Sequence, residues 1–167
     1  MMKNQQLHSE HYESLYRKVY ALLGDLTPLR ADCGVLCNHA CCKGSCNDGM
    51  RLFPHEPTNL PAREVDGGTL VVCDGSCDRN ERPLACRIFP FFPTIDAKGR
   101  IFVEADMRAA RLCPLISHSD DIVFDKRFFK ALKRVGKALA KDSECRKFLE
   151  DVTEEIDTFA KFYSSDD

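Results

Sequence analysis

Ten cysteines dominate the chemistry available to this chain, and nine of them lie between residues 33 and 113. Thiols at this density form disulfide frameworks in secreted domains or bind metal in reduced compartments. Isolated cysteines also serve as small buried hydrophobes, but five of them between residues 33 and 46 exceed what packing alone requires. The cysteines are Cys33, Cys37, Cys41, Cys42, Cys46, Cys73, Cys77, Cys86, Cys113 and Cys145.

The N-terminal sequence and the charge narrow these alternatives. The start MMKNQQLHSEHYE lacks the apolar segment of a signal peptide, and no apolar run is long enough to span a bilayer. We therefore expect a cytoplasmic protein whose reduced thiols bind metal. The formal charge of −2, from 24 basic and 26 acidic residues, gives no field that would attract nucleic acid or an anionic membrane. The expected partners are a metal ion or cluster and a protein.

The first cysteine group, CGVLCNHACCKGSC, spans residues 33–46. In a continuous helix Cys33 and Cys41 would lie about 12 Å apart along the axis, too far for one zinc ion with Zn–S bonds of about 2.3 Å. Either the backbone folds around the metal, with Gly34 and Gly44 supplying turn freedom, or the ligands divide between two centres. Because neighbouring side chains diverge, the adjacent pair Cys41 and Cys42 favours an iron–sulfur cluster or a binuclear site.

The second group contains Cys73, Cys77 and Cys86. The short turn DGS between Cys73 and Cys77 can present two thiolates together, and Cys86 follows in RPLACRIFPFFP. Four thiolates around a metal centre leave net negative charge. Arg82 and Arg87, which flank Cys86, are therefore expected to donate hydrogen bonds to sulfur and to tune the centre.

The remaining cysteines and the histidines receive different interpretations. Cys113 precedes a proline, as in ferredoxin-type ligand runs, and joins the candidate ligands. Cys145 lies on the apolar face of a predicted helix and is expected to be a buried thiol. His39 lies within the first group and is an alternative ligand. We assign no metal-binding role to three histidines, which we expect to be solvated, namely His8, His11 and His55.

Apolar periodicity predicts helices at both ends of the chain. A one-faced pattern over residues 12–23 predicts a helix that ends near Gly24, and two such patterns predict two helices within residues 125–163. Between these ends, residues 69–73 and 101–103 are typical of strands in a small antiparallel sheet.

The length of 167 residues suits one hydrophobic core, so we expect a single domain over residues 1–167. Its predicted fold class is a mostly helical α+β fold with a small antiparallel sheet. The helical flanks, residues 8–25 and 125–163, would pack around a cysteine-rich, metal-bound middle at residues 30–115.

Two segments resemble the YkgJ-like cysteine-cluster family, described as a zinc- or iron-chelating domain with a CxxCxxCC signature. They are CGVLCNHACC at residues 33–42 and DGSCDRNERPLACRIFPF at residues 74–91, and the resemblance covers about residues 30–115. It implies that the signature and downstream cysteines correspond to Cys33, Cys37, Cys41, Cys42, Cys77 and Cys86. Local reasoning alone adds Cys46, Cys73 and Cys113 as candidate metal ligands.

The leading functional prediction is a protein that holds an iron–sulfur centre or zinc for electron transfer or metal handling. Flagellin lysine N-methylase is similar to the YkgJ-like family, which implies an alternative role as an enzyme acting on protein substrates. Gly67 and Gly68 do not form the glycine-rich fingerprint of a nucleotide-binding methyltransferase, and no Ser-His-Asp order or phosphate loop is present. A third hypothesis is thiol redox chemistry at Cys73 and Cys77 or at the adjacent pair.

Overall fold

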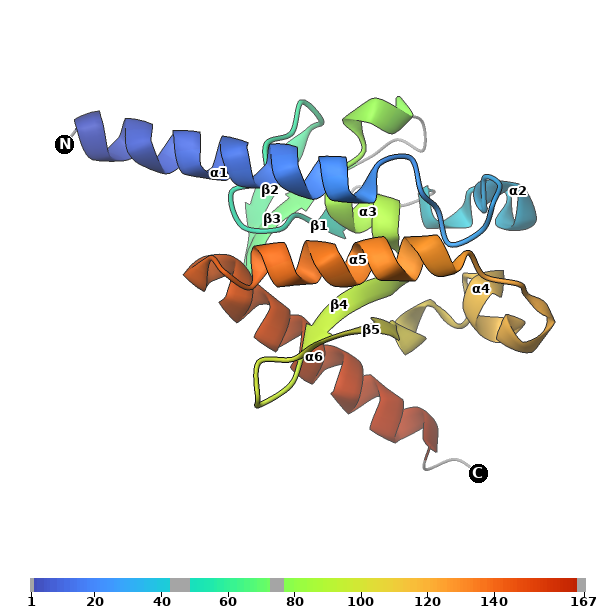
Figure 1. The fold of residues 1–167 in the computed structure, drawn as a ribbon. Coiled ribbons are helices and arrows are strands. Elements are labelled where there is room, and N and C mark those ends of the chain that lie inside the picture. The colour runs from blue at the N-terminus through green and yellow to red at the C-terminus, as the bar shows by residue number, and fades with distance from the viewer. Residues whose placement is uncertain (1, 43–48, 73–76, 165–167) are drawn as a thin grey trace.

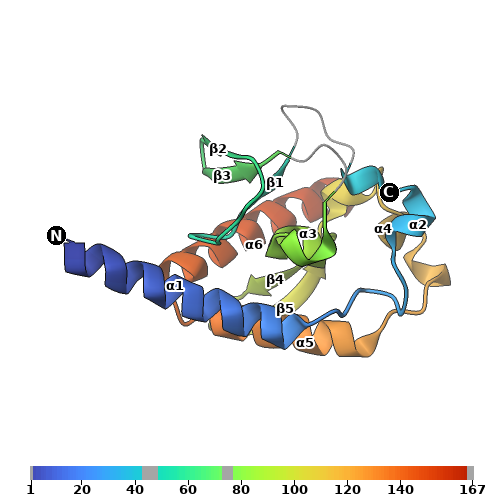
Figure 2. The same ribbon diagram turned by 90° about the horizontal axis from the view of Figure 1, so that it is seen from above.

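The computed structural model describes residues 2–42, 49–72 and 77–164. In these segments the long helices are α1 (Met2–Leu23), α5 (Lys126–Leu139) and α6 (Ser143–Ser164). α1 and α5 lie side by side in both ribbon views, and α6 starts near the end of α5 and runs away from it at an angle (Figures 1 and 2). The periodicity in the sequence predicted these three helices correctly.

The buried faces of the helices explain why the sequence forms them. Tyr16, Val19 and Leu23 of α1 are almost fully buried at the spacing of one helical face. α1 ends at Gly24, whose positive φ of 56° and N–H bond to the Tyr20 carbonyl form a left-handed C-terminal cap. The predicted end of this helix is therefore confirmed.

The strands form two antiparallel sheets. Strand β1 (Met50–Arg51) pairs with β3 (Gly68–Val71), which also pairs with β2 (Ala62–Val65). Strands β4 (Phe91–Ile95) and β5 (Ile101–Ala105) form a separate hairpin. The two predicted strand segments therefore belong to different sheets, and the sequence patterns did not predict β2 or β4.

The β4–β5 hairpin lies in the core, where α5 and α6 both pack against it (Figure 1). Every residue of β4 is buried. A Cβ atom added at Gly136 of α5 would lie 2.7 Å from side-chain atoms of Pro93 and Ile101, so this glycine permits the helix to approach the hairpin closely. The hairpin, and not a cysteine segment, thus fills the space next to α5.

The three-stranded sheet attaches to α6 through Arg51. The Arg51 guanidinium lies 3.2 Å from the Glu155 carboxylate and 4.8 Å from the centre of the Phe148 ring. The Phe148 ring also packs on Phe53, with ring centres 4.7 Å apart. This sheet therefore has a fixed position beside the cysteine-containing segments.

Short helices carry half of the described cysteines, namely Cys37, Cys41, Cys42 and Cys86. α2 and α4 lie together at the end of the molecule where α1 ends and α5 begins, and α3 lies between this end and the three-stranded sheet (Figures 1 and 2). The short elements are α2 (Gly34–Cys37), η1 (Ala40–Cys42), η2 (Arg79–Glu81), α3 (Leu84–Ile88), η3 (Met107–Ala109), α4 (Pro114–Ser117) and η4 (Ser119–Asp121).

The predicted fold class, a mostly helical α+β fold with little antiparallel sheet, is confirmed. Buried residues of α1, α3, the hairpin, α5 and α6 form one hydrophobic cluster. In the described segments, the helices that are long enough to cross a membrane are too polar to do so.

Candidate metal centre

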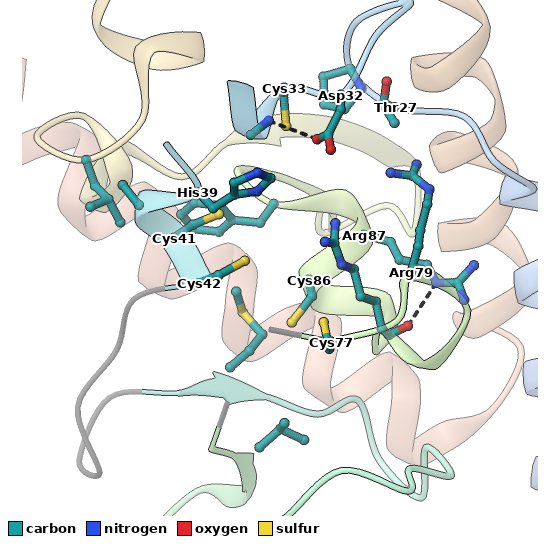
Figure 3. A pocket seen from close by; sticks show the side chains of 18 of the residues that line it. Thr27, Asp32, Cys33, His39, Cys41, Cys42, Cys77, Arg79, Cys86 and Arg87 are labelled. Carbon is teal, nitrogen blue, oxygen red and sulfur yellow. Dashed lines mark hydrogen bonds between the residues drawn. The ribbon is translucent and has the colours of Figure 1, made fainter. Parts of the chain in front are cut away.

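A cavity of about 430 Å³ brings cysteines from both sequence groups together. The five that line it are Cys33, Cys41, Cys42, Cys77 and Cys86. In the close view, the sulfur atoms of Cys42, Cys77 and Cys86 point toward the same space (Figure 3). Two distant parts of the sequence thus supply soft metal-binding atoms to one site.

The other predicted ligands have different positions. Cys37 and Cys113 are not part of the cavity wall. Cys46 and Cys73 lie outside the described residues. Cys145, which we expected to be a buried thiol, is fully buried against Tyr16, with 3.8 Å between the thiol sulfur and the phenol oxygen.

The first cysteine segment folds back on itself, as the ligand spacing predicted. α2 ends at Asn38, and the left-handed φ angles of Asn38 (50°) and His39 (54°) separate it from η1. A Cβ atom at Gly34 would lie only 2.2 Å from Nδ1 of His39. The expectation that Gly34 supplies turn freedom is therefore wrong, because the left-handed turn lies at Asn38 and His39 and this glycine admits the His39 ring. Gly44 lies outside the described residues.

The adjacent thiols Cys41 and Cys42 form a hydrogen-bonded pair. A hydrogen bond from Cys41 lowers the pKa of Cys42 to about 6, against the opposing effect of burial, and the charges of Arg82 and His39 add to the shift. The same hydrogen bond raises the pKa of Cys41, because that thiol is the donor. Cys42 is therefore the thiol of the pair that ionises first, in the form that binds metal and attacks electrophiles.

Cys33, which lines the cavity, also lies near Cys37 and Cys113, which do not line it. Burial raises the pKa of Cys33 to about 11, and the nearby charges of Asp32, Cys113 and Cys37 increase the shift. Burial also raises the pKa of Cys113, which caps α4 before Pro114. The Cys37 thiol donates to the Gly34 carbonyl over 3.9 Å. In the absence of metal, Cys33 and Cys113 are therefore protonated thiols at neutral pH.

Three arginines line the cavity, and backbone oxygens hold two of them. Arg87 donates from Nε to the Arg82 carbonyl and from Nη2 to the Asn80 carbonyl, both over 2.8 Å. Its guanidinium also lies 4.6 Å from the centre of the Tyr20 ring. Arg79 donates to the Asp25 carbonyl over 3.3 Å. Arg87 therefore fixes the turn that precedes α3.

Arg82 instead faces the cysteines. Burial lowers its pKa, but the hydrogen bond and charge of Cys77, with the charge of Cys42, outweigh that effect and leave the pKa raised. The buried Nε of Arg82 has no hydrogen-bond partner within the described segments. A buried donor without an acceptor is costly, so this atom marks a place where an acidic or sulfur-containing ligand would be stabilised.

Glu56 positions the helix that carries Cys86. Its buried carboxylate accepts hydrogen bonds from the Leu84 N–H at 2.6 Å, from the Phe53 N–H at 3.2 Å and from the Tyr20 hydroxyl. Burial raises the pKa of Glu56, and these hydrogen bonds oppose that shift. The carboxylate therefore ties the start of α3 to α1 and to the loop after β1.

The spacing of the donor atoms distinguishes between kinds of metal centre. Four thiolates around one zinc ion, with bonds of about 2.3 Å, would lie about 3.8 Å apart. Within the described segments, the cysteines do not form a compact group of three ligand atoms. For four of these thiolates to bind one zinc ion, the described sulfurs would have to move closer together.

A second group of metal-ligating side chains, His8, His55 and Glu144, is brought together elsewhere in the molecule. We expected the two histidines to be solvated, and both are exposed, but each lies beside the Glu144 carboxylate. No sequence pattern predicts this group because its members come from α1, the loop after β1 and α6.

Comparisons of the chain with protein-family models, curated proteins and solved structures gave no match.

Proposed function

We propose that this chain binds an iron–sulfur cluster, or zinc as the alternative, through the cysteines of the cavity and serves in electron transfer or metal handling in the cytoplasm. The observation that carries the proposal is the convergence of five cysteines from two sequence groups on one cavity that Arg82 also faces. The resemblance of these segments to the YkgJ-like family supports the same function.

The residues divide into ligands and supports. Cys42, Cys77 and Cys86 are the proposed central ligands, because their sulfurs point into the same space (Figure 3). When bound, an iron–sulfur cluster would supply one-electron chemistry, with a potential set partly by hydrogen bonds to sulfur. Arg82 is placed to donate such bonds and to offset the negative charge of the thiolates.

Metal and sulfide analysis of cysteine variants tests this assignment. We expect Cys42→Ser and Cys86→Ser to lose most of the iron and sulfide, or the zinc, found in anaerobically purified protein. Cys145→Ser should retain it, because that thiol is buried in the core. Equal losses in all three variants, or native protein free of metal and sulfide, would refute the proposal.

Cys37→Ser sharpens the test because Cys37 does not line the cavity but lies near Cys33 and Cys113. A single cavity centre predicts full metal content in this variant. Loss of only part of the metal would indicate that the ligands divide between two centres, with Cys37 in the second.

The electrostatics of the adjacent thiols favour a second candidate function, thiol–disulfide exchange. The lowered pKa of Cys42 gives a thiolate at neutral pH, and such a thiolate attacks a disulfide to form a mixed disulfide. The attack breaks the S–S bond of the substrate and releases one of its halves as a thiol, so metal-free protein should release one thiol per Cys42 from a small disulfide, and Cys42→Ser should abolish this release. The metal-binding proposal instead predicts that bound metal suppresses this reactivity.

A further inference from the structure

Two imidazoles and one carboxylate converge where α1, the loop after β1 and the start of α6 meet. His8 Nε2 lies 3.8 Å from one Glu144 oxygen, and His55 Nε2 lies 2.9 Å from the other. One ligand atom from each of the three residues lies within 4.8 Å of the other two. None of these residues lines the cysteine cavity.

The spacing suits a small divalent ion. Donors bound tetrahedrally at about 2.0–2.1 Å from zinc lie about 3.3 Å from one another. The distances from the two imidazoles to the carboxylate, 2.9 and 3.8 Å, run to its two different oxygens and lie on either side of that value. With all three ligand atoms within 4.8 Å of one another, the side chains would have to move closer together to bind one zinc ion.

The surrounding residues hold the two imidazoles in place. The Tyr12 ring stacks on His55, with 4.2 Å between centres and 30° between planes, and contacts His8 edge-on at 4.8 Å. His55 has a left-handed φ of 55°, a conformation that non-glycine residues seldom adopt and that is common at functional sites. The Glu144 N–H donates to Asp142, which fixes the start of α6.

Two histidines share one carboxylate, and their rings are only 4.8 Å apart. Without metal, His55 Nε2 makes a hydrogen bond to this carboxylate. Two histidines and one glutamate are the ligand set of many zinc sites. Zinc would replace the hydrogen bond, because Nε2 and the carboxylate would then both face the ion.

We propose that His8, His55 and Glu144 form a binding site for a divalent transition-metal ion, with zinc as the preferred occupant. The three side chains are about half exposed, which leaves coordination positions for water or for a ligand from another molecule. Metal bound here would join α1 to α6 and to the loop that contains Glu56. The inference does not rest on the cysteine site, because it uses different donor atoms at a different place.

Titration of the full-length protein with zinc chloride, followed by histidine side-chain NMR, tests the site. We expect the His8 and His55 imidazole signals to shift together and to saturate at one zinc ion for this site, while His118 remains unchanged. The residue-resolved readout separates this event from any binding by cysteine. Unchanged His8 and His55 signals, or equal shifts of every histidine, would overturn the proposal.

Two variants complete the test. His55→Ala should abolish the saturable shift of His8, because two ligands are then too few to hold the ion. His11→Ala is the matched control: His11 lies one turn from His8 on α1, is equally exposed and binds Asp142 at 3.0 Å. This variant should leave the His8 shift intact, and its loss there would contradict the assignment.

Discussion

The helical core and the cysteine-lined cavity are held together by different forces. In the core, α1, α5, α6 and the β4–β5 hairpin bury large apolar side chains, and Gly136 allows close packing. Around the cavity, short helices present thiols and guanidinium groups that are only partly buried. Burial of apolar area stabilises the first region without help. Within the second region, α3 is anchored by buried apolar residues, but α2 and η1 bury only Gly34, so ligand binding should contribute much of the order of residues 33–42.

Two groups couple these regions. Glu56 joins α1 to the start of α3, and Arg87 stacks on Tyr20 while holding the turn before Cys86. These contacts place Cys86 on the rigid core before any metal binds. The comparison teaches that the core fixes where Cys86 lies, whereas the segment at residues 33–42 depends more on its ligand.

The largest effect on the free energy of unfolding should come from a substitution in the helical core. Leu132 is fully buried in α5, and Leu132→Ala should lower the free energy of unfolding by about 2–5 kcal/mol through lost burial and a cavity. Leu7→Ala on the exposed face of α1 should change it by less than about 0.5 kcal/mol. Urea denaturation measures both. Similar losses in the two variants would mean that the core does not carry the stability.

Removal of metal should lower amide protection around the cysteine-lined cavity and not in the helical core. After chelation, amide protection should fall in residues 33–42, because thiolates no longer bind a common centre there. The β4–β5 hairpin and α5 should keep their protection, because apolar packing holds them. Hydrogen exchange with mass spectrometry measures this contrast. Uniform loss, or none, would remove the distinction between the two regions.

Arg82 should matter more for metal retention than its neighbour Arg79. Arg82→Gln removes the charge that faces Cys77 and should weaken metal binding about 10–100-fold, the range seen for groups that support metal ligands. Arg79→Gln is the control, because that arginine lines the same cavity but binds a backbone carbonyl. Competition with a chelator measures the affinities, and equal weakening would contradict the assigned role.

The smallest predicted effect concerns the reactivity of Cys42 without metal. Its pKa of about 6 places the thiolate at neutral pH, so its alkylation rate should level off above about pH 7, where an ordinary thiol still gains thiolate. Cys33, with a pKa of about 11, should react slowly and speed up throughout that range. Site-resolved mass spectrometry with iodoacetamide measures both rates. Parallel pH profiles would contradict the lowered pKa of Cys42.

The comparison also explains what the sequence could predict. Periodic apolar residues and Gly24 predicted the long helices, because the residues that form and bury a helix lie within one continuous stretch of sequence. The sequence did not predict β4. This strand is buried on both faces and contains Pro93, so it shows no alternation of apolar and polar residues. The cysteines were recognisable by type, but spacing could not show that Cys37 and Cys113 lie off the cavity wall. Contacts between distant segments decide that, as they do for His8 and Glu144.

X-ray absorption at the metal edge of anaerobically purified protein tests the central claim most directly. The account predicts a first shell of sulfur at about 2.3 Å, the distance of thiolate ligands. A further shell of iron neighbours would identify a cluster, and its absence at a zinc edge would identify zinc. A first shell of only nitrogen and oxygen at about 2.0–2.1 Å would contradict the account, because the cavity cysteines would then not be the metal ligands.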